Sequence, residues 1–275
     1  MLNKKAVLFS TLLSVFVLNC ISITRKNKQT IFLPLAYPNI ETAHQHFSAH
    51  KPTFLWDLHK VLFDKKMSRM FLYSRPTTSN STSSSRFTIL KECIQSLLSV
   101  NTYKTLYKES QRGNKVTQAY FESVAHRPAL YTAFLHIANN IYVPNQEVCT
   151  ILADLKHAGY REFILSNTGP DILADFVTQY PQIFDNFTSK QNSINSTMLH
   201  KDGQVTSYTG SWLFKPQPEA YKAAIKRSGA AANDHIFIDN KLKNVIAAQK
   251  EGIVGILFIN PAQLRDNLQA LGIKI

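Results

Sequence analysis

A set of polar residues follows the apolar stretches of this chain, and their types suit phosphoryl transfer. Each alone has a commoner explanation, because an acid or a Ser-Asn pair after a strand is often a helix cap, and a single lysine is usually a surface charge. Together they supply a carboxylate that attacks phosphorus and forms an acyl phosphate, which water then cleaves. A hydroxyl, turn amides and an ammonium would stabilise the phosphoryl oxygens, and oxygen ligands would hold Mg²⁺. The residues of this set are Asp57, Ser166, Asn167, Lys215, Asp239 and Asn240.

The elements that must position these residues alternate between strand and helix from Pro144 onwards. Such alternation predicts an α/β fold with a parallel sheet covered on both faces, and sheets of this kind bind ligands at the carboxyl ends of their strands. The helix after Lys215 is expected to open at Pro216. Apolar runs predict strands at 53–57, 161–166, 235–240 and 254–259, and helical patterns cover 145–159, 170–180, 215–229, 241–252 and 261–272.

Between the first strand and this alternating region the sequence predicts a helical insert over residues 63–142. Strand signals are nearly absent there, and apolar residues recur at helical spacing in three stretches, 87–100, 114–127 and 128–140. A Ser/Thr-rich segment, 74–86, predicts a flexible loop inside the insert.

At this point the chain resembles the haloacid dehalogenase (HAD) superfamily of hydrolases, in the subgroup that carries a helical cap between its first two motifs. The resemblance implies a Rossmann-like parallel-sheet core formed by residues 52–62 and 143–275, with the helical cap at 63–142 inserted after the first strand. It is carried by "FLWDLHKVLF", "FILSNTG", "SWLFKPQPEAY" and "IFIDNKLKNVIAAQKEGIVGILF", which are similar to the four motifs of the family in order and spacing.

The resemblance implies a role for each residue of the phosphate site. Asp57 would be the nucleophile, and Ser166 would bind a phosphoryl oxygen together with amides near Asn167 and Thr168. Lys215 would pair with both Asp57 and the phosphate. The implied activity is a phosphatase that acts on a small phosphorylated molecule through an aspartyl-phosphate intermediate.

The resemblance also implies a Mg²⁺ site, at which the chain departs from the family pattern. The ligands would be Asp57, the backbone carbonyl of His59, Asp239 and Asn240. His59 stands where the family has the acid/base Asp, and Asn240 stands where it has a second metal-binding acid. The imidazole is either a replacement acid/base or the mark of a lost one, and the uncharged Asn240 should weaken Mg²⁺ binding. Lys60 replaces a Gly and is strained if its turn needs a positive φ.

These departures leave three functions open. The first is the Mg²⁺-dependent phosphatase with His59 in place of the usual acid/base Asp. The alternative is a catalytically weakened or inactive HAD-like protein that binds a ligand or partner through the same cleft. A metal-free dehalogenase is the third, and it is disfavoured because His59 stands where that chemistry usually has an aromatic residue.

The N-terminus has the layout of a targeting segment. Lys4 and Lys5 precede an apolar run from Ala6 to about Ile23, so residues 1–24 predict either a cleaved signal peptide or a retained membrane anchor. The protein would then be exported or membrane-anchored. Residues 25–51 are interpreted as a linker or irregular lead-in.

Composition narrows the partners without choosing among them. Lys and Arg exceed Asp and Glu by 31 to 18, for a formal charge of +13, which favours phosphorylated substrates or an anionic membrane surface. There is no basic-aromatic pattern typical of nucleic-acid binding.

Cys93 and Cys149 lie in helical patterns, and the sequence leaves open whether they pair. An extra segment, 189–204, predicts a hairpin-like turn at Asp202–Gly203.

Overall fold

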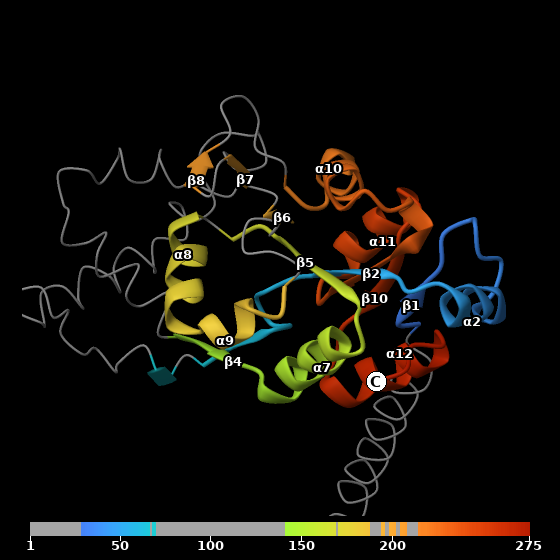
Figure 1. Ribbon diagram of the computed structural model, residues 1–275, viewed down its shortest axis with the longest axis horizontal. Helices are drawn as coiled ribbons and strands as arrows, with labels where there is room; N and C mark the ends of the chain where they lie inside the picture. Colours follow the sequence, from blue (N-terminus) through green and yellow to red (C-terminus); the bar gives the residue numbers. More distant parts are fainter. Residues whose placement is uncertain are drawn as a thin grey trace, which may run out of the picture.

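The computed structural model describes residues 29–66, 68–69, 141–168, 170–187, 194–195, 198–201, 204–207 and 214–275 (Figure 1). The targeting segment predicted at residues 1–24, nearly all of the helical cap and Cys93 lie outside these residues. Among the described residues, no helix is long and apolar enough to cross a membrane.

The centre of the fold is an eight-stranded sheet whose strand order is β1-β10-β9-β2-β5-β6-β7-β8 (Figure 1). The strands from β10 to β6 are parallel, while β1 pairs antiparallel with β10 at one edge and β7 and β8 form an antiparallel hairpin at the other. This confirms the mostly parallel α/β core. The strands are β1 Ile31–Phe32, β2 Thr53–Trp56, β5 Arg161–Ser166, β6 Ile194–Asn195, β7 Met198–Lys201, β8 Gln204–Ser207, β9 His235–Asp239 and β10 Val254–Leu257.

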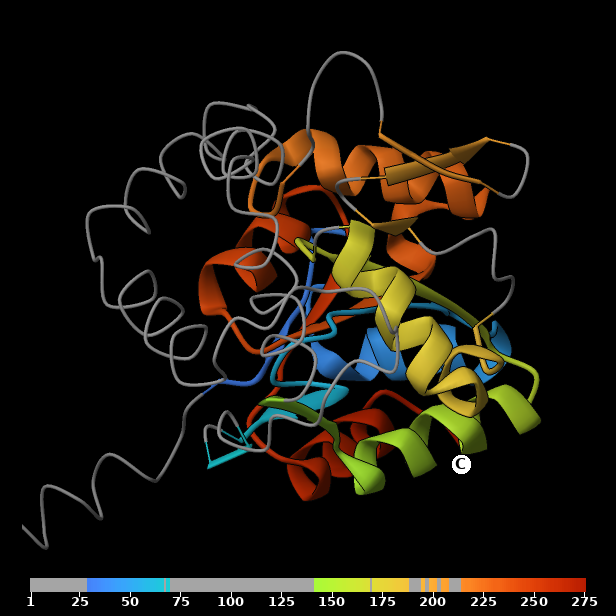
Figure 2. The ribbon, with the colours of Figure 1, turned by 90° about the vertical axis from the view of Figure 1, so that its left-hand side faces the viewer.

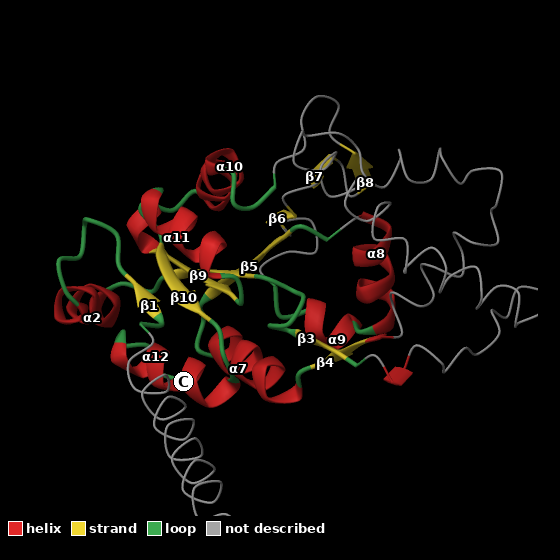
Figure 3. Ribbon diagram, turned by 180° about the vertical axis from the view of Figure 1, so that it is seen from behind, coloured by secondary structure: helices red, strands yellow, loops and turns green. Residues whose placement is uncertain are grey.

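Helices cover both faces of the sheet, as the alternating sequence predicts. Figure 2 shows the sheet between α10 and α11 on one side and α7 and α12 on the other, and Figure 3 shows the same layers from behind. The helix predicted to open at Pro216 begins two residues later. The helices are α2 Ile40–Ala49, α7 Gln146–His157, α8 Pro170–Gln179, α9 Pro181–Phe184, α10 Pro218–Ser228, α11 Leu242–Lys250 and α12 Pro261–Ala270.

The two faces have separate apolar cores because side chains alternate along each strand. Leu55 and Phe237 pack in a cluster with Tyr221 of α10. Phe54 and Trp56, the neighbours of Leu55, pack in the other and larger cluster. Gly255 lets α11 lie close to β10, because a Cβ at this position would meet Val245 Cγ1 at 2.5 Å. Both faces of β2 are therefore buried, and only the ends of the strand remain to carry polar groups.

Residues 29–51 differ from the irregular lead-in that the sequence suggested. Residues 31–32 form β1 of the main sheet, and residues 40–49 form α2, whose Ala43 and Phe47 are buried in the larger core. A capping box between Asn39 and Thr42 fixes the start of this helix. The lead-in is therefore part of the core.

Two short strands bracket the predicted cap. β3, Phe63–Lys65, pairs antiparallel with β4, Tyr142–Pro144, and Asp64 lies opposite Val143. The two ends of the segment between these strands therefore lie side by side, directly after the first motif. At the other edge of the sheet, Lys201 of β7 pairs antiparallel with Gln204 of β8. The turn predicted between them, at Asp202–Gly203, lies outside the described residues.

A buried acid in β5 makes stability depend on pH. Trp56 Nε1 donates to Glu162 Oε2 at 2.8 Å. Burial raises the pKa of Glu162 well above its usual value, although the Trp56 hydrogen bond and the charge of Lys156 act in the opposite direction. A raised carboxyl pKa means that the folded state holds a proton that the unfolded state releases, so stability falls as pH rises above about 4.5.

We therefore expect Glu162→Gln to be more stable than the wild type at pH 8, and the difference to shrink towards pH 5. The amide keeps an oxygen that accepts from Trp56 and needs no proton to be neutral. Chemical denaturation across this pH range measures the effect, with the exposed Glu41→Gln as control. Parallel stability curves for the wild type and Glu162→Gln would contradict the assignment.

Candidate active site

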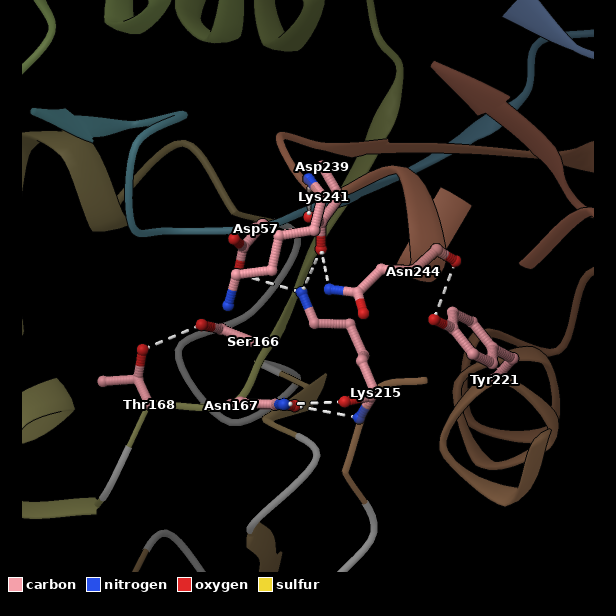
Figure 4. A network of polar contacts seen from close by, with 9 residues as sticks. All are labelled: Asp57, Ser166, Asn167, Thr168, Lys215, Tyr221, Asp239, Lys241 and Asn244. Atoms are coloured by element: carbon pink, nitrogen blue, oxygen red, sulfur yellow. Dashed lines mark hydrogen bonds and ion pairs between the residues drawn. The ribbon is translucent and has the colours of Figure 1, made fainter. Parts of the chain in front are cut away.

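Three polar residues meet at the carboxyl edge of the sheet because their strands are neighbours. Asp57 follows β2, Ser166 ends β5 and Asp239 ends β9, and β2 lies between the other two strands. Their residues are 5%, 1% and 0% exposed respectively, so the two carboxylates lie in a largely dry environment. Figure 4 shows the carboxylates of Asp57 and Asp239 turned towards a common centre, with Ser166 close by.

The ammonium of Lys215 occupies that centre. It donates to Asp57 Oδ1 at 2.9 Å and to Asp239 Oδ2 at 2.7 Å (Figure 4). Burial lowers the pKa of Lys215, but the carboxylates of Asp239 and Asp57 outweigh burial and raise it above its usual value. Lys215 therefore stays charged, and its charge holds the two acids together.

Asn167 fixes the position of Lys215 through two side-chain bonds. Its Oδ1 accepts from the backbone N–H of Lys215, and its Nδ2 donates to the Lys215 carbonyl, each at 2.9 Å. The sequence predicts phosphate binding by backbone amides near Asn167, and this stays a prediction. The structure adds that the side chain of Asn167 holds the backbone of Lys215. Beside it, Ser166 Oγ and Thr168 Oγ1 share a hydrogen bond of 2.8 Å.

Three residues that the sequence did not single out hold Asp239 in place, two of them directly and one through Asn244. Its Oδ1 accepts from the backbone N–H of Lys241 at 2.7 Å, and its Oδ2 also accepts from Asn244 Nδ2 at 2.8 Å. The hydroxyl of Tyr221 donates to the carbonyl of Asn244 at 2.8 Å. Burial raises the pKa of Asp239, the charge of Lys215 lowers it and Asp57 raises it, with a net increase. Tyr221 lies in the third motif and Asn244 in the fourth, so the family motifs were the signal that could have identified these two residues.

His59 follows Asp57 by two residues and lies in an aromatic environment. Its ring stacks on Tyr142 with centroids 4.2 Å apart and meets Phe176 edge-on at 5.9 Å. Its Nε2 is buried and has no hydrogen-bond partner among the described residues. Burial, followed by the charges of Lys241, Lys215 and Lys65, lowers the pKa of His59 to about 3. At neutral pH this imidazole is therefore uncharged.

The turn at Lys60 has a positive φ, which is the condition under which the sequence predicts strain at this residue. Its φ is 63°, in the left-handed region, while its N–H donates to the Phe63 carbonyl at 2.7 Å. A residue with a Cβ in this region costs about 1–2 kcal/mol relative to an extended or right-handed conformation. The turn after Asp57 is therefore formed at the expense of local strain, where glycine would be relaxed.

The side chains at this edge fit a magnesium ion in part. Asn240 Oδ1 is buried and has no hydrogen-bond partner within the described part of the chain, so it is a carbonyl oxygen without an acceptor role in the fold. Asp57 supplies a carboxylate nearby, whereas both oxygens of Asp239 already accept hydrogen bonds. Among the described residues, no three His, Cys, Asp or Glu side chains gather as a metal-binding group. An Mg²⁺ site here would depend on Asp57, Asn240 and backbone oxygen.

Comparison with solved structures identifies the fold. A HAD family enzyme of Bacteroides thetaiotaomicron, solved as a magnesium complex, aligns with a TM-score of 0.51 and 19% identity over 78% of this chain and 98% of that one. An L-2-haloacid dehalogenase of Xanthobacter autotrophicus, with chloropropionic acid covalently bound, aligns with a TM-score of 0.46 and 17% identity over 82% of this chain and 85% of the other. The chain has the fold of the haloacid dehalogenase superfamily.

Among curated proteins, a sesquiterpene phosphatase of Aspergillus oryzae is 48% identical over 42 residues. The match covers 15% of this chain and 21% of that relative, so it compares a short segment of each. No family model matches the chain.

Proposed function

We propose that the protein is a Mg²⁺-dependent phosphatase that cleaves a small phosphorylated substrate through an aspartyl-phosphate intermediate at Asp57. The observation that carries the proposal is the buried Asp57–Lys215–Asp239 arrangement at the carboxyl ends of adjacent strands. The short match to a phosphatase and the magnesium complex of a structural neighbour support the same class.

In this mechanism the Asp57 carboxylate attacks phosphorus, and the bond between phosphorus and the leaving oxygen breaks. Lys215 orients Asp57 and would stabilise the phosphoryl oxygens, while the hydroxyl of Ser166 would donate a hydrogen bond to one of them. Water then cleaves the acyl phosphate and restores the carboxylate. Mg²⁺ held by Asp57, Asn240 and the His59 carbonyl would neutralise charge on the phosphoryl group.

His59 takes the place of the family's acid/base Asp in this proposal. With its pKa lowered to about 3, the imidazole is a weak base and holds no proton for the leaving group in the ligand-free protein. A bound phosphate dianion would oppose the effect of the lysine charges and raise this pKa. Fast release of poor leaving groups is therefore not expected.

The alternative, a weakened or inactive relative that binds a ligand or partner, has specific support. Asn240 lacks the charge of an acid, His59 is neutral and Lys60 is strained. Restoring the family pattern with His59→Asp and Asn240→Asp separates the two functions. A large gain in hydrolysis would favour a decayed enzyme, whereas a loss would favour a site adapted to its present residues.

The proposal predicts slow hydrolysis of a generic aryl phosphate by the wild type when Mg²⁺ is present. Removing divalent ions with a chelator should lower the rate at least about tenfold, and adding Mg²⁺ back should restore it, because the ion offsets repulsion between the carboxylate and the phosphate. Steady-state release of the phenol measures the rate. A wild type that is inactive across several phosphate esters and divalent ions would rule out the enzyme.

We also propose that the protein is exported or membrane-anchored through residues 1–24. Leu257 N donates to the Thr30 carbonyl, and Phe258 N donates to the Asp239 carbonyl, so the chain joins the sheet at the carboxyl edge that holds the site. A retained anchor would then keep the site near the membrane, because the few residues before Thr30 span at most about 3.6 Å each. Fractionation and N-terminal sequencing of the mature protein test this proposal, and a soluble protein with an intact N-terminus would overturn it.

A further inference from the structure

Lys241 lies in the turn between β9 and α11, next to the acids of the site. Its backbone N–H donates to Asp239 Oδ1 at 2.7 Å, which fixes the base of the residue at the site. In the view of Figure 4 its side chain projects towards the part of the network that holds Asp57 and Ser166. Lys241 therefore lies beside the acids of the site.

The position is a poor one for a lysine on structural grounds. Lys241 is the N-cap of α11 and makes no side-chain capping bond. N-cap positions favour Ser, Thr, Asp and Asn, and a positive charge at a helix N-terminus opposes the helix dipole. The residue therefore costs the helix stability rather than adding to it, and its presence needs another explanation.

The charges of the site supply that explanation. Lys215 donates to two carboxylates, so its charge is already compensated within the protein. Lys241 is an exposed residue, and no hydrogen bond or ion pair joins its ammonium to any described residue. Among the described residues, it is consequently a cation at the site that remains available to an incoming anion.

We infer that Lys241 is a second cation of the phosphate site, whose ammonium binds phosphoryl oxygens on the solvent side while Lys215 holds the nucleophile beneath them. The inference rests on the proposed phosphatase function. The ammonium supplies positive charge at a site that has Asn240 in place of an acid, where Mg²⁺ is bound less firmly. A surface lysine that only adds solubility would leave phosphate binding unchanged.

Inorganic phosphate, the product of the proposed reaction, is the probe. Its affinity is measured by calorimetry in Mg²⁺ on the full chain, for the wild type, Lys241→Met, Lys241→Arg and Lys250→Met. Lys250 is an exposed lysine at the other end of α11, so it matches the charge change away from the site. Because the bond to Asp239 comes from the backbone of residue 241, every substitution at this position keeps it.

We expect phosphate to bind Lys241→Met about tenfold more weakly than the wild type, as the loss of one charge-assisted bond predicts. Lys241→Arg should retain most of the affinity, and Lys250→Met should match the wild type. Thermal unfolding of Lys241→Met should show no loss of stability, whereas a structural role would lower its Tm.

The outcomes separate this inference from the proposed function. If the wild type hydrolyses the aryl phosphate but Lys241→Met binds phosphate equally well, the role of Lys241 is refuted and the phosphatase stands. If Lys241→Met and Lys250→Met lose affinity to the same extent, the effect is one of net charge and the inference is again refuted. A wild type that neither hydrolyses the ester nor binds phosphate would overturn both.

Discussion

Asp57→Asn should reduce hydrolysis of an aryl phosphate at least about a thousandfold, because removing a nucleophile eliminates the covalent route rather than slowing it. The amide has nearly the shape of the carboxylate and still accepts the Lys215 hydrogen bond through its oxygen. The loss should therefore appear in kcat, while the protein stays folded. Steady-state kinetics on purified full-length protein, with circular dichroism as a folding check, measures it.

The matched control is Asp266→Asn, which makes the same change on an exposed residue of α12. Its rate should equal that of the wild type. Hydrolysis by Asp57→Asn at more than a few per cent of the wild-type rate would show that another group attacks phosphorus, and the assignment of Asp57 would fail.

Lys215→Met should lower the free energy of unfolding by about 3–5 kcal/mol, because the two buried carboxylates would lose the charge that compensates them. Asp57 and Asp239 are 5% and 0% exposed, so water replaces the ammonium only poorly. Urea denaturation at pH 7 measures the change. The exposed Lys222→Met, whose side chain is 64% accessible, should cost less than about 0.5 kcal/mol.

A double variant makes this prediction independent of whether Lys215→Met folds well. Adding Asp239→Asn to Lys215→Met removes one of the two uncompensated charges and should recover part of the lost stability. If the double variant is less stable than Lys215→Met, the repulsion between the acids is not what Lys215 relieves.

The sequence was sufficient to place the acids and the lysine, because the positions depend on a simple rule. Parallel strands end at the same edge of a sheet, so Asp57, Ser166 and Asp239 had to meet once the strands were recognised. The alternation of helix and strand also predicted the two covered faces. The pairing of Lys215 with Asp57 was implied by the family motifs, and the structure shows it at 2.9 Å.

Other features depend on contacts that no spacing encodes. The side chain of Asn167 holds the backbone of Lys215, a contact between residues 48 positions apart that only the fold reveals. The aromatic rings around His59 come from β4 and α8, which are far from it in sequence, so the lowered pKa could not be inferred. Residues 29–51 were interpreted as irregular because β1 is only two residues long and leaves almost no periodic signal.

The measurement that tests the central claim most directly is chemical trapping of the covalent intermediate. The wild type is mixed with a phosphate ester in Mg²⁺, quenched in acid within the first turnovers, and digested for mass spectrometry. We predict that the peptide containing Asp57 carries one phosphoryl group, and that Asp57→Asn carries none. A phosphoryl group on a different residue, or steady turnover with an unmodified Asp57 peptide, would contradict the account.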